Sequence, residues 1–393
     1  MITFADIIAP ISEEEFFASY YDKKPLYIPG QLEKFGHIMN WDALNRILNM
    51  SAYWSTATLQ LVKDRERIPA AAYCETALGS TGQSTMRPNA KKVTDHLHAG
   101  ASLVLNDIDT LTPEVAAVAD ALEKTLNGKA QSNLYCSWKQ RQAFFSHFDT
   151  HDVYALHFEG EKTWRIYENR MPHPIRHSRF TSTGPDFDRE NRGEVMMEIT
   201  MKPGDFLYLP RGWYHDALAS SSGTVHIAFG VTQVIGLDFV QAMTDVVVND
   251  ELFRKNFPRL EDGRNAVKKR IAALAEKFAK MAKDDQIIDA MTQFITDYHY
   301  DRGGFALPIE SREIHFKTTD SSFNVQKNGP QKILVGRKGA VPIPPAIQDP
   351  VLWIVEKGNF ARSDFTMAFS SLGIDALDNI LADMKNMGII AEV

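Results

Sequence analysis

Two histidines and one aspartate have the residue types and the spacing of a metal site. His147 and Asp149 are separated by one residue, so on a β-strand their side chains leave the same face and can share one ion. His215 follows a Pro-Gly-Asp turn, a short apolar stretch and a Pro-Arg-Gly turn, and it supplies a second imidazole. Two histidines and one carboxylate that bind facially leave coordination positions open, which suits non-haem Fe(II) that activates O₂. The sequence therefore predicts an iron site at these three residues.

The stretch after the first two ligands has the pattern of a strand, a turn and a second strand. Residues 153–158 are strand-like, residues 159–162 have the composition of a hairpin turn, and Lys162 and Trp164 then alternate with their neighbours. A His-x-Asp tripeptide alone is weak evidence, because it occurs by chance in many chains. Together with the turn and with the strand that leads to His215, it is a strong signal.

On these residues the chain resembles the JmjC-type 2-oxoglutarate oxygenases and, within them, the cupin-like ribosomal oxygenases of bacteria and eukaryotes. The resemblance extends to residues 16–26 and, more loosely, to the C-terminal third. It implies an α+β fold built on a double-stranded β-helix, the jelly-roll barrel of cupin and JmjC proteins. Members of the family read His-x-Asp, then Lys or Arg on the following strands, then Pro-Arg-Gly-x-x-His, which this chain matches at His147, Asp149, Lys162 and His215.

The resemblance also implies Fe(II), 2-oxoglutarate and O₂, and it assigns residues to the cosubstrate. Lys162 would pair with the far carboxylate of 2-oxoglutarate, since a lysine is a compact charge suited to one carboxylate end. Asn133 and Tyr135, on one face of the preceding strand, would contact the same molecule. The chain departs from its relatives at Gly230, where they often carry a hydroxyl residue. Thr232 lies on the same strand face and is expected to compensate.

Several of these residues also have an ordinary structural interpretation. Lys162 could be a surface lysine of the turn, Asn133 a turn residue and Tyr135 a core aromatic. His157 is expected to be a packed strand residue rather than a fourth ligand. His226 is expected to be a hydrogen-bonded histidine of the barrel, with a place near the metal as the alternative.

The chain is predicted to contain three domains. Residues 1–235 would form the catalytic barrel, with residues 172–192 as a loop near its mouth. Residues 236–304 are predicted to be helical, because apolar residues recur from residue 267 to residue 281 with the spacing of an amphipathic helix. Residues 305–393 end in two helices and a strand, which suggests a winged helix. In the ribosomal oxygenases a helical dimerisation region precedes a winged-helix domain, so the resemblance implies a homodimer.

Capping residues locate two of the helices. Thr112 and Pro113 are predicted to begin a helix that runs to about Leu126, where Asn127 and a glycine end it. Ser363 is predicted to cap the first of the two C-terminal helices.

Composition restricts the class of protein. The 393 residues carry a net charge of −7, which argues against broad nucleic-acid binding through phosphates. The two cysteines, Cys74 and Cys136, rule out a disulfide framework and agree with a reducing cytosol. We read no signal peptide and no stretch near the roughly 20 apolar residues of a membrane-spanning helix. A cytoplasmic protein without membrane contact is expected.

Three functions remain open on the sequence. The first is an Fe(II)- and 2-oxoglutarate-dependent hydroxylase that acts on a protein side chain, with an arginine or histidine of a ribosomal protein as the precedent in the family. The second is the same chemistry on a peptide or a small molecule. The third is a non-catalytic metal-binding cupin and winged-helix interaction module, and the same ligands also bind zinc. The intact ligand set favours the first two.

Overall fold

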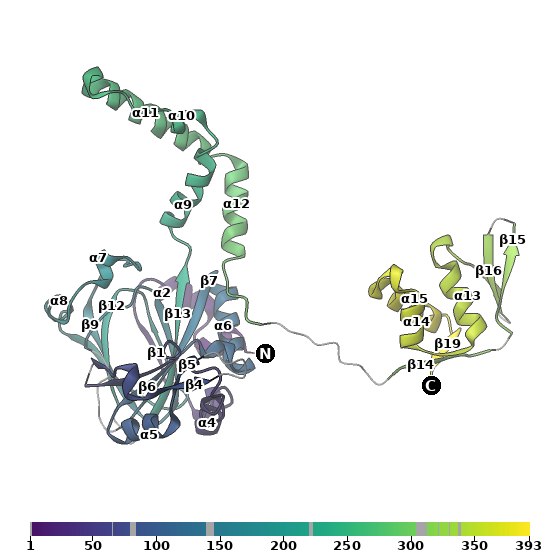
Figure 1. Ribbon diagram of the computed structural model, residues 1–393, viewed down its shortest axis with the longest axis horizontal. Helices are drawn as coiled ribbons and strands as arrows, with labels where there is room; N and C mark the ends of the chain where they lie inside the picture. The colour runs from purple at the N-terminus through teal and green to yellow at the C-terminus, as the bar shows by residue number, and fades with distance from the viewer. Residues whose placement is uncertain are drawn as a thin grey trace. The chain divides into compact units, whose positions relative to one another are not determined.

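The computed structural model describes residues 2–64, 66–78, 84–138, 145–219, 223–303, 313–320, 322–329, 331–336 and 339–393. The chain divides into two compact units, Met1–Gly304 and Phe305–Val393 (Figure 1). The predicted boundary between residues 304 and 305 falls within residues 304–312, outside the described residues. The predicted boundary between residues 235 and 236 lies inside the first unit and stays a prediction.

The larger wall of the barrel is an eight-stranded antiparallel sheet in the order β1-β11-β8-β13-β7-β6-β2-β3. Its strands are β1 (Leu26–Ile28), β2 (Leu59–Lys63), β3 (Glu66–Arg67), β6 (Ser102–Asn106), β7 (Gly128–Ser137), β8 (Asp152–Glu159), β11 (Phe206–Leu209) and β13 (Thr224–Gln233).

The facing wall is a three-stranded sheet in the order β10-β9-β12. Its strands are β9 (Lys162–Arg170), β10 (Val195–Met201) and β12 (Trp213–Ala219), while β4 (Cys74–Leu78) and β5 (Ser84–Pro88) pair separately. From β8 the chain crosses to β9 and β10, returns at β11, crosses again at β12 and returns at β13, as in a double-stranded β-helix.

One predicted connection is wrong in its pairing. Residues 159–162 were expected to join a hairpin, but β8 pairs with β11 and β13, whereas β9 pairs with β10 and β12. Gly160 and Glu161 therefore carry the chain from one sheet to the other. Gly160 has φ 66°, a left-handed conformation that glycine adopts without steric cost. Local sequence marks such a turn but does not say which strands it joins.

Alternating side chains of the larger sheet enter two separate cores. Tyr154, Leu156 and Phe158 of β8 pack outward into a cluster that includes residues of the covering helices. Val153 and Ala155 point inward and pack with Trp164 and other residues of the smaller sheet. Both faces of β8 are buried for this reason. The covering helices are α1 (Phe4–Ile8), α2 (Glu13–Ser19), α3 (Leu32–Phe35), α4 (Trp41–Leu48), α5 (Ala90–His98) and α6 (Pro113–Leu126).

The predicted caps of α6 are confirmed. The Thr112 hydroxyl accepts a hydrogen bond from the Val115 amide at 3.2 Å, and Asn127 ends the helix at φ 47°. Within residues 172–192, predicted to be a loop, the structure instead contains two short helices. They are α7 (Ser178–Thr181) and α8 (Pro185–Asn191).

Four helices follow β13, as expected for a helical region. They are α9 (Gly236–Val247), α10 (Glu251–Arg254), α11 (Gly263–Met281) and α12 (Asp285–Thr296). Every residue of these helices is described, and Met243 is the one that is buried. After α12, the Arg302 guanidinium is buried and ion-paired with Asp109 and Glu123, which fastens the end of the helical region to α6 and its preceding turn.

The second unit has its own core, which includes Phe316, Ile354, Phe365 and Leu381. Ser363 is not the helix cap that the sequence suggested: it lies inside α14, whose N-cap is Ala361. A sheet in the order β18-β14-β19 and a second in the order β15-β16-β17 accompany three helices. The elements are β14 (His315–Thr318), β15 (Asn324–Asn328), β16 (Gln331–Gly336), β17 (Gly339–Pro342), α13 (Gln348–Lys357), β18 (Asn359–Ala361), α14 (Arg362–Ala368), α15 (Ile374–Asn386) and β19 (Ile390–Glu392).

Two expectations from composition can be compared with the described residues. Cys74 and Cys136 are both free and buried. None of the described helices combines the length and the apolarity that crossing a bilayer would take.

Candidate metal centre

Backbone pairing places the two histidine ligands beside each other. His147 and His215 form an antiparallel bridge, in which each amide donates to the other's carbonyl at 3.0 and 2.8 Å. The Nδ1 of His147 lies 2.8 Å from the Phe145 carbonyl, and the Nδ1 of His215 lies 2.9 Å from the Trp213 carbonyl. A carbonyl can only accept, so each Nδ1 carries the proton and each Nε2 carries the lone pair that a metal needs.

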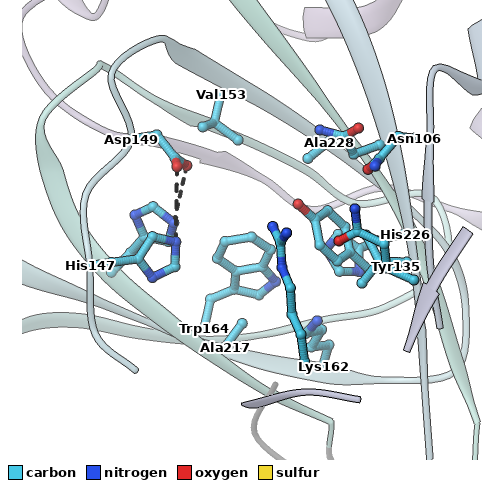
Figure 2. A pocket seen from close by; sticks show the side chains of 15 residues that line it. Asn106, Tyr135, His147, Asp149, Val153, Lys162, Trp164, Ala217, His226 and Ala228 are labelled. Carbon is cyan, nitrogen blue, oxygen red and sulfur yellow. Dashed lines mark ion pairs between the residues drawn. The ribbon is translucent and has the colours of Figure 1, made fainter. Parts of the chain in front are cut away.

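Asp149 faces both Nε2 atoms (Figure 2). Its carboxylate oxygens lie 3.6 Å from His215 Nε2 and 4.0 Å from His147 Nε2. The three candidate donor atoms all fall within 4.8 Å of one another, and in the described part of the chain this is the one cluster of its kind. The structure thus brings together the three ligands that the sequence predicted.

The charge states of these groups suit metal binding. Burial, with a smaller effect of His147, lowers the pKa of His215 to about 4. Burial alone would raise the pKa of Asp149, but His151, His147 and His215 outweigh it and hold this pKa below its usual value. Near neutral pH the site therefore offers a neutral imidazole and an ionised carboxylate, the forms that bind a metal ion.

The donor cluster stands at one end of a pocket of about 350 Å³ between the two sheets. Strand register explains its floor, because Tyr135 of β7 lies across from Val104 of β6 and His226 of β13. The lining residues are Gln60, Arg67, Val104, Asn106, Asn133, Tyr135, His147, Asp149, Val153, Lys162, Trp164, His215, Ala217, His226 and Ala228.

Lys162 is a buried cation of this pocket rather than a surface residue. It is 5% exposed, and its ammonium lies 5.8 Å from the ring centre of Tyr135 and 5.9 Å from that of Trp164. Burial lowers its pKa to about 7. Among the described residues no carboxylate forms an ion pair with it. A buried ammonium without a counter-ion is costly, so this end of the pocket is built to receive an anion.

Two further polar atoms of the lining support this conclusion. Trp164 Nε1 and His226 Nδ1 are buried and have no hydrogen-bond partner among the described residues. His226 stacks on Tyr135, with ring centroids 5.0 Å apart, and burial lowers its pKa well below the usual value. Buried polar groups are normally paired, so such atoms indicate a missing ligand. His226, expected to be a hydrogen-bonded histidine of the barrel, lines the same pocket as the three predicted ligands.

The structure does not bring Thr232 to the pocket. Its side chain is exposed, near the end of β13, and it does not line the cavity. The space above Gly230 is taken by the His151 ring, because a Cβ at Gly230 would lie 2.7 Å from His151 Cε1. His151 thus fills the space beside Gly230, and Thr232 drops out of the candidate site.

Arg192, the last residue of the segment 172–192, connects the two chain segments that carry the histidine ligands. Arg192 donates to the Ser146 hydroxyl at 2.9 Å, and its guanidinium lies 4.3 Å from the ring centre of Tyr167. Tyr167 in turn donates to Asp216 at 2.5 Å. Ser146 and Asp216 each adjoin a histidine ligand, so this chain of contacts steadies both.

Sequence reasoning missed the rim of the pocket on β2, β3 and β6. Gln60, Arg67 and Asn106 line it, yet they lie far from the ligand motif in sequence. Alternation within β6 indicates which of its side chains share a face, but no local signal indicates that this face meets the metal ligands.

Residues 105–238 match the family model described as a JmjC domain. This stretch of the chain is therefore similar to JmjC domains. The JmjC match contains the three ligands, Lys162, Asn133 and Tyr135. It leaves out β2 and β3, and with them Gln60 and Arg67.

Two named proteins are similar to the chain over more than this region. It is 24% identical over 351 residues to the bifunctional lysine-specific demethylase and histidyl-hydroxylase NO66 of Aedes aegypti, which covers 83% of this chain and 52% of that protein. It is 24% identical over 266 residues to human ribosomal oxygenase 1, which covers 64% of this chain and 39% of that protein. The chain thus spans about half or less of the length of these relatives.

A solved structure shows the same fold over nearly the whole chain. YcfD, a ribosomal oxygenase from Escherichia coli in complex with cobalt and 2-oxoglutarate, aligns with a TM-score of 0.51 and 15% sequence identity. The alignment covers 98% of each chain. At this identity the likeness establishes the fold.

Proposed function

We propose that this protein is an Fe(II)- and 2-oxoglutarate-dependent oxygenase that hydroxylates a side chain of a ribosomal protein. The observation that carries the proposal is the shared pocket. It is lined by a two-histidine, one-carboxylate cluster and by a buried lysine that has no counter-ion among the described residues. A relative of the same fold was solved with cobalt and 2-oxoglutarate, a divalent metal and a dicarboxylate.

The pocket residues divide between the metal and the cosubstrate. His147, Asp149 and His215 would hold Fe(II), which when bound supplies O₂ activation coupled to oxidative decarboxylation of 2-oxoglutarate. Lys162 would pair its ammonium with the far carboxylate. The orphaned donor of Trp164 and the polar groups of Asn133, Tyr135 and His226 would complete the cosubstrate contacts.

The apolar part of the lining has a different task. Val153, Ala217 and Ala228 face the same cavity and carry no polar side-chain group (Figure 2). They would keep bulk water out of the reacting centre. Without that water, the electrostatic contacts to the cosubstrate are stronger.

The identity of the substrate rests on the relatives' names. Those names describe ribosomal oxygenases and a histidyl-hydroxylase, so a ribosomal protein is the substrate class to test first. The experiment is to measure the intact mass of every ribosomal protein from the parent cell and from a strain that lacks this gene. We expect one protein to be lighter by one oxygen in the deletion strain, and fragmentation then names the residue. Unchanged masses throughout would move the search to other proteins, peptides and small molecules.

We also propose that α9 to α12 form a homodimer interface and that residues 305–393 are a winged-helix domain. In the helical region, large apolar side chains lie exposed although the helices are amphipathic, which is what a partner surface requires. Light scattering should give about twice the 44.3 kDa mass of the chain. Ile271→Asp with Ile288→Asp should give the single-chain mass, and a monomeric parent protein would refute the assignment. The exposed apolar residues are Leu237, Val240, Val248, Ile271, Ile288, Phe294 and Ile295.

A further inference from the structure

The pocket contains a second cation that the proposed reaction does not use. Arg67 lines the pocket from β3, the outermost strand of the larger sheet. It lies across from Val62 of β2, which packs with Val104 and Tyr135 on the pocket side of the sheet. Among the described residues Arg67 has no ion-pair partner.

Arg67 and Lys162 occupy different depths. Lys162 is buried, whereas the Arg67 side chain is exposed, so Arg67 stands at the open side of the pocket. Its charge still reaches the interior. Burial raises the pKa of Tyr135, the Asp149 carboxylate raises it further, and Arg67 lowers it. Tyr135, Asp149 and Arg67 line the same pocket, so the Arg67 guanidinium acts electrostatically on a group inside it.

The charges of the loaded pocket show what Arg67 adds. The charges inside the loaded pocket sum to zero. The divalent metal and the Lys162 ammonium are balanced by the Asp149 carboxylate and the doubly negative cosubstrate. Among the described residues of the lining, Asp149 is the one carboxylate, and the metal would occupy it. Arg67 thus leaves the entrance with one uncompensated positive charge. A guanidinium or an ammonium that entered here would meet a like charge and no carboxylate to bind it.

We propose that Arg67 selects the residue that is hydroxylated, by donating hydrogen bonds to an uncharged acceptor side chain, an imidazole or a carboxamide, and by repelling arginine and lysine. This inference rests on the proposed oxygenase function and adds the chemical class of its target. The side-chain amides of Gln60 and Asn106 line the same rim, and an amide can donate to such an acceptor as well. Selection of this kind combines an attractive contact to one class with a repulsive contact to the other.

The test measures side-chain selectivity at the metal without needing the natural substrate. The protein is loaded with Co(II) and 2-oxoglutarate, and the visible spectrum of the Co(II) is followed during titration. The four probes are N-acetyl methylamides of histidine, asparagine, arginine and lysine. We expect the histidine and asparagine probes to bind at least about tenfold more tightly than the arginine and lysine probes. Equal binding of all four, tighter binding of the cations, or no binding of any would overturn the proposal.

Charge reversal gives the sharper result. In Arg67→Glu the order should invert, so that the arginine and lysine probes become the tighter pair. Loss of a merely structural arginine would weaken all four probes alike and leave their order unchanged, which would refute the assignment. Arg46→Glu is the matched control, because Arg46 is an exposed residue of α4 outside the pocket lining and its replacement changes the net charge equally. It should keep the parent order.

A second readout separates this inference from the function on which it rests. With Fe(II), 2-oxoglutarate and ribosomes from the deletion strain, the parent protein should form succinate and oxidise a histidine or an asparagine. Succinate together with oxidation of an arginine or a lysine would refute the role of Arg67 and leave the oxygenase intact. If no succinate forms, the oxygenase proposal fails, and the Co(II) titration alone then decides whether Arg67 sets selectivity.

Discussion

The two ends of the pocket differ in burial, and this difference separates chemistry from selectivity. At the inner end, Lys162 and His215 come from adjacent strands of the smaller sheet and are buried. The other two proposed ligands, His147 and Asp149, are half-buried. At the rim, Arg67 comes from the edge of the larger sheet and is exposed. A buried group is desolvated and strongly perturbed, so it can fix a metal and a cosubstrate. An exposed group acts through a screened charge and can change without loss of the fold.

Removal of a metal ligand should have the largest effect. Asp149→Ala takes away the carboxylate that both histidines face. We expect turnover to fall by more than about 100-fold, the loss already caused by removing a residue that only supports a ligand. Metal content by mass spectrometry and succinate formation measure it. Full activity of this variant would show that the inner end is not a metal site. Asp186→Ala, at an exposed carboxylate of α8, is the control.

Removal of the buried cation should affect the cosubstrate and spare the metal. Lys162→Ala is expected to raise the 2-oxoglutarate KM by about 30-fold or more, since a desolvated charge pair is worth roughly 2 kcal/mol or more. Bound iron should stay near the parent level. Lys202→Ala is the matched control, because Lys202 is an exposed lysine near the same turn. An unchanged KM in Lys162→Ala would assign the carboxylate to another residue of the pocket.

The affinity for 2-oxoglutarate should depend on pH in a defined direction. Burial lowers the pKa of Lys162 to about 7 in the empty pocket, so its ammonium is charged below that pH and neutral above it. A carboxylate needs the charged form. The Kd should therefore be nearly constant below pH 7 and rise above it, toward about tenfold per pH unit. Calorimetry between pH 6 and 9 measures this, and in Lys162→Met the rise should disappear.

The smallest expected effect is on stability, for a substitution at Gly230, where the chain packs against His151. Gly230→Ser would place a Cβ 2.7 Å from the His151 ring, so the ring must move. We expect a loss of about 1–3 kcal/mol of unfolding free energy, as for other insertions into a packed site. Thr232→Ala, on the same strand but exposed, should change the stability by less than about 0.5 kcal/mol. Equal melting temperatures for the two variants would contradict the packing argument.

Local patterns predicted those features that depend on neighbouring residues. The Thr112 and Pro113 signals located α6, because a cap bonds to amides within its own first turn. Alternation placed Asn133 and Tyr135 on one face of β7, and both line the pocket. The prediction that Ser363 caps α14 was wrong. A serine also occurs within the first turn of a helix, and here the backbone makes Ala361 the N-cap.

The sequence by itself determined the donor types, their spacing, and the faces on which strand residues lie, since the period of a strand is a local property. The tertiary structure alone decided that residues 159–162 cross between sheets, that His151 fills the space at Gly230, and that Thr232 stays outside. It also decided that Arg67 reaches the pocket, through the chain of pairings from β3 across β2 and β6 to β7. These outcomes depend on contacts between segments distant in sequence, whose partners a local pattern does not specify.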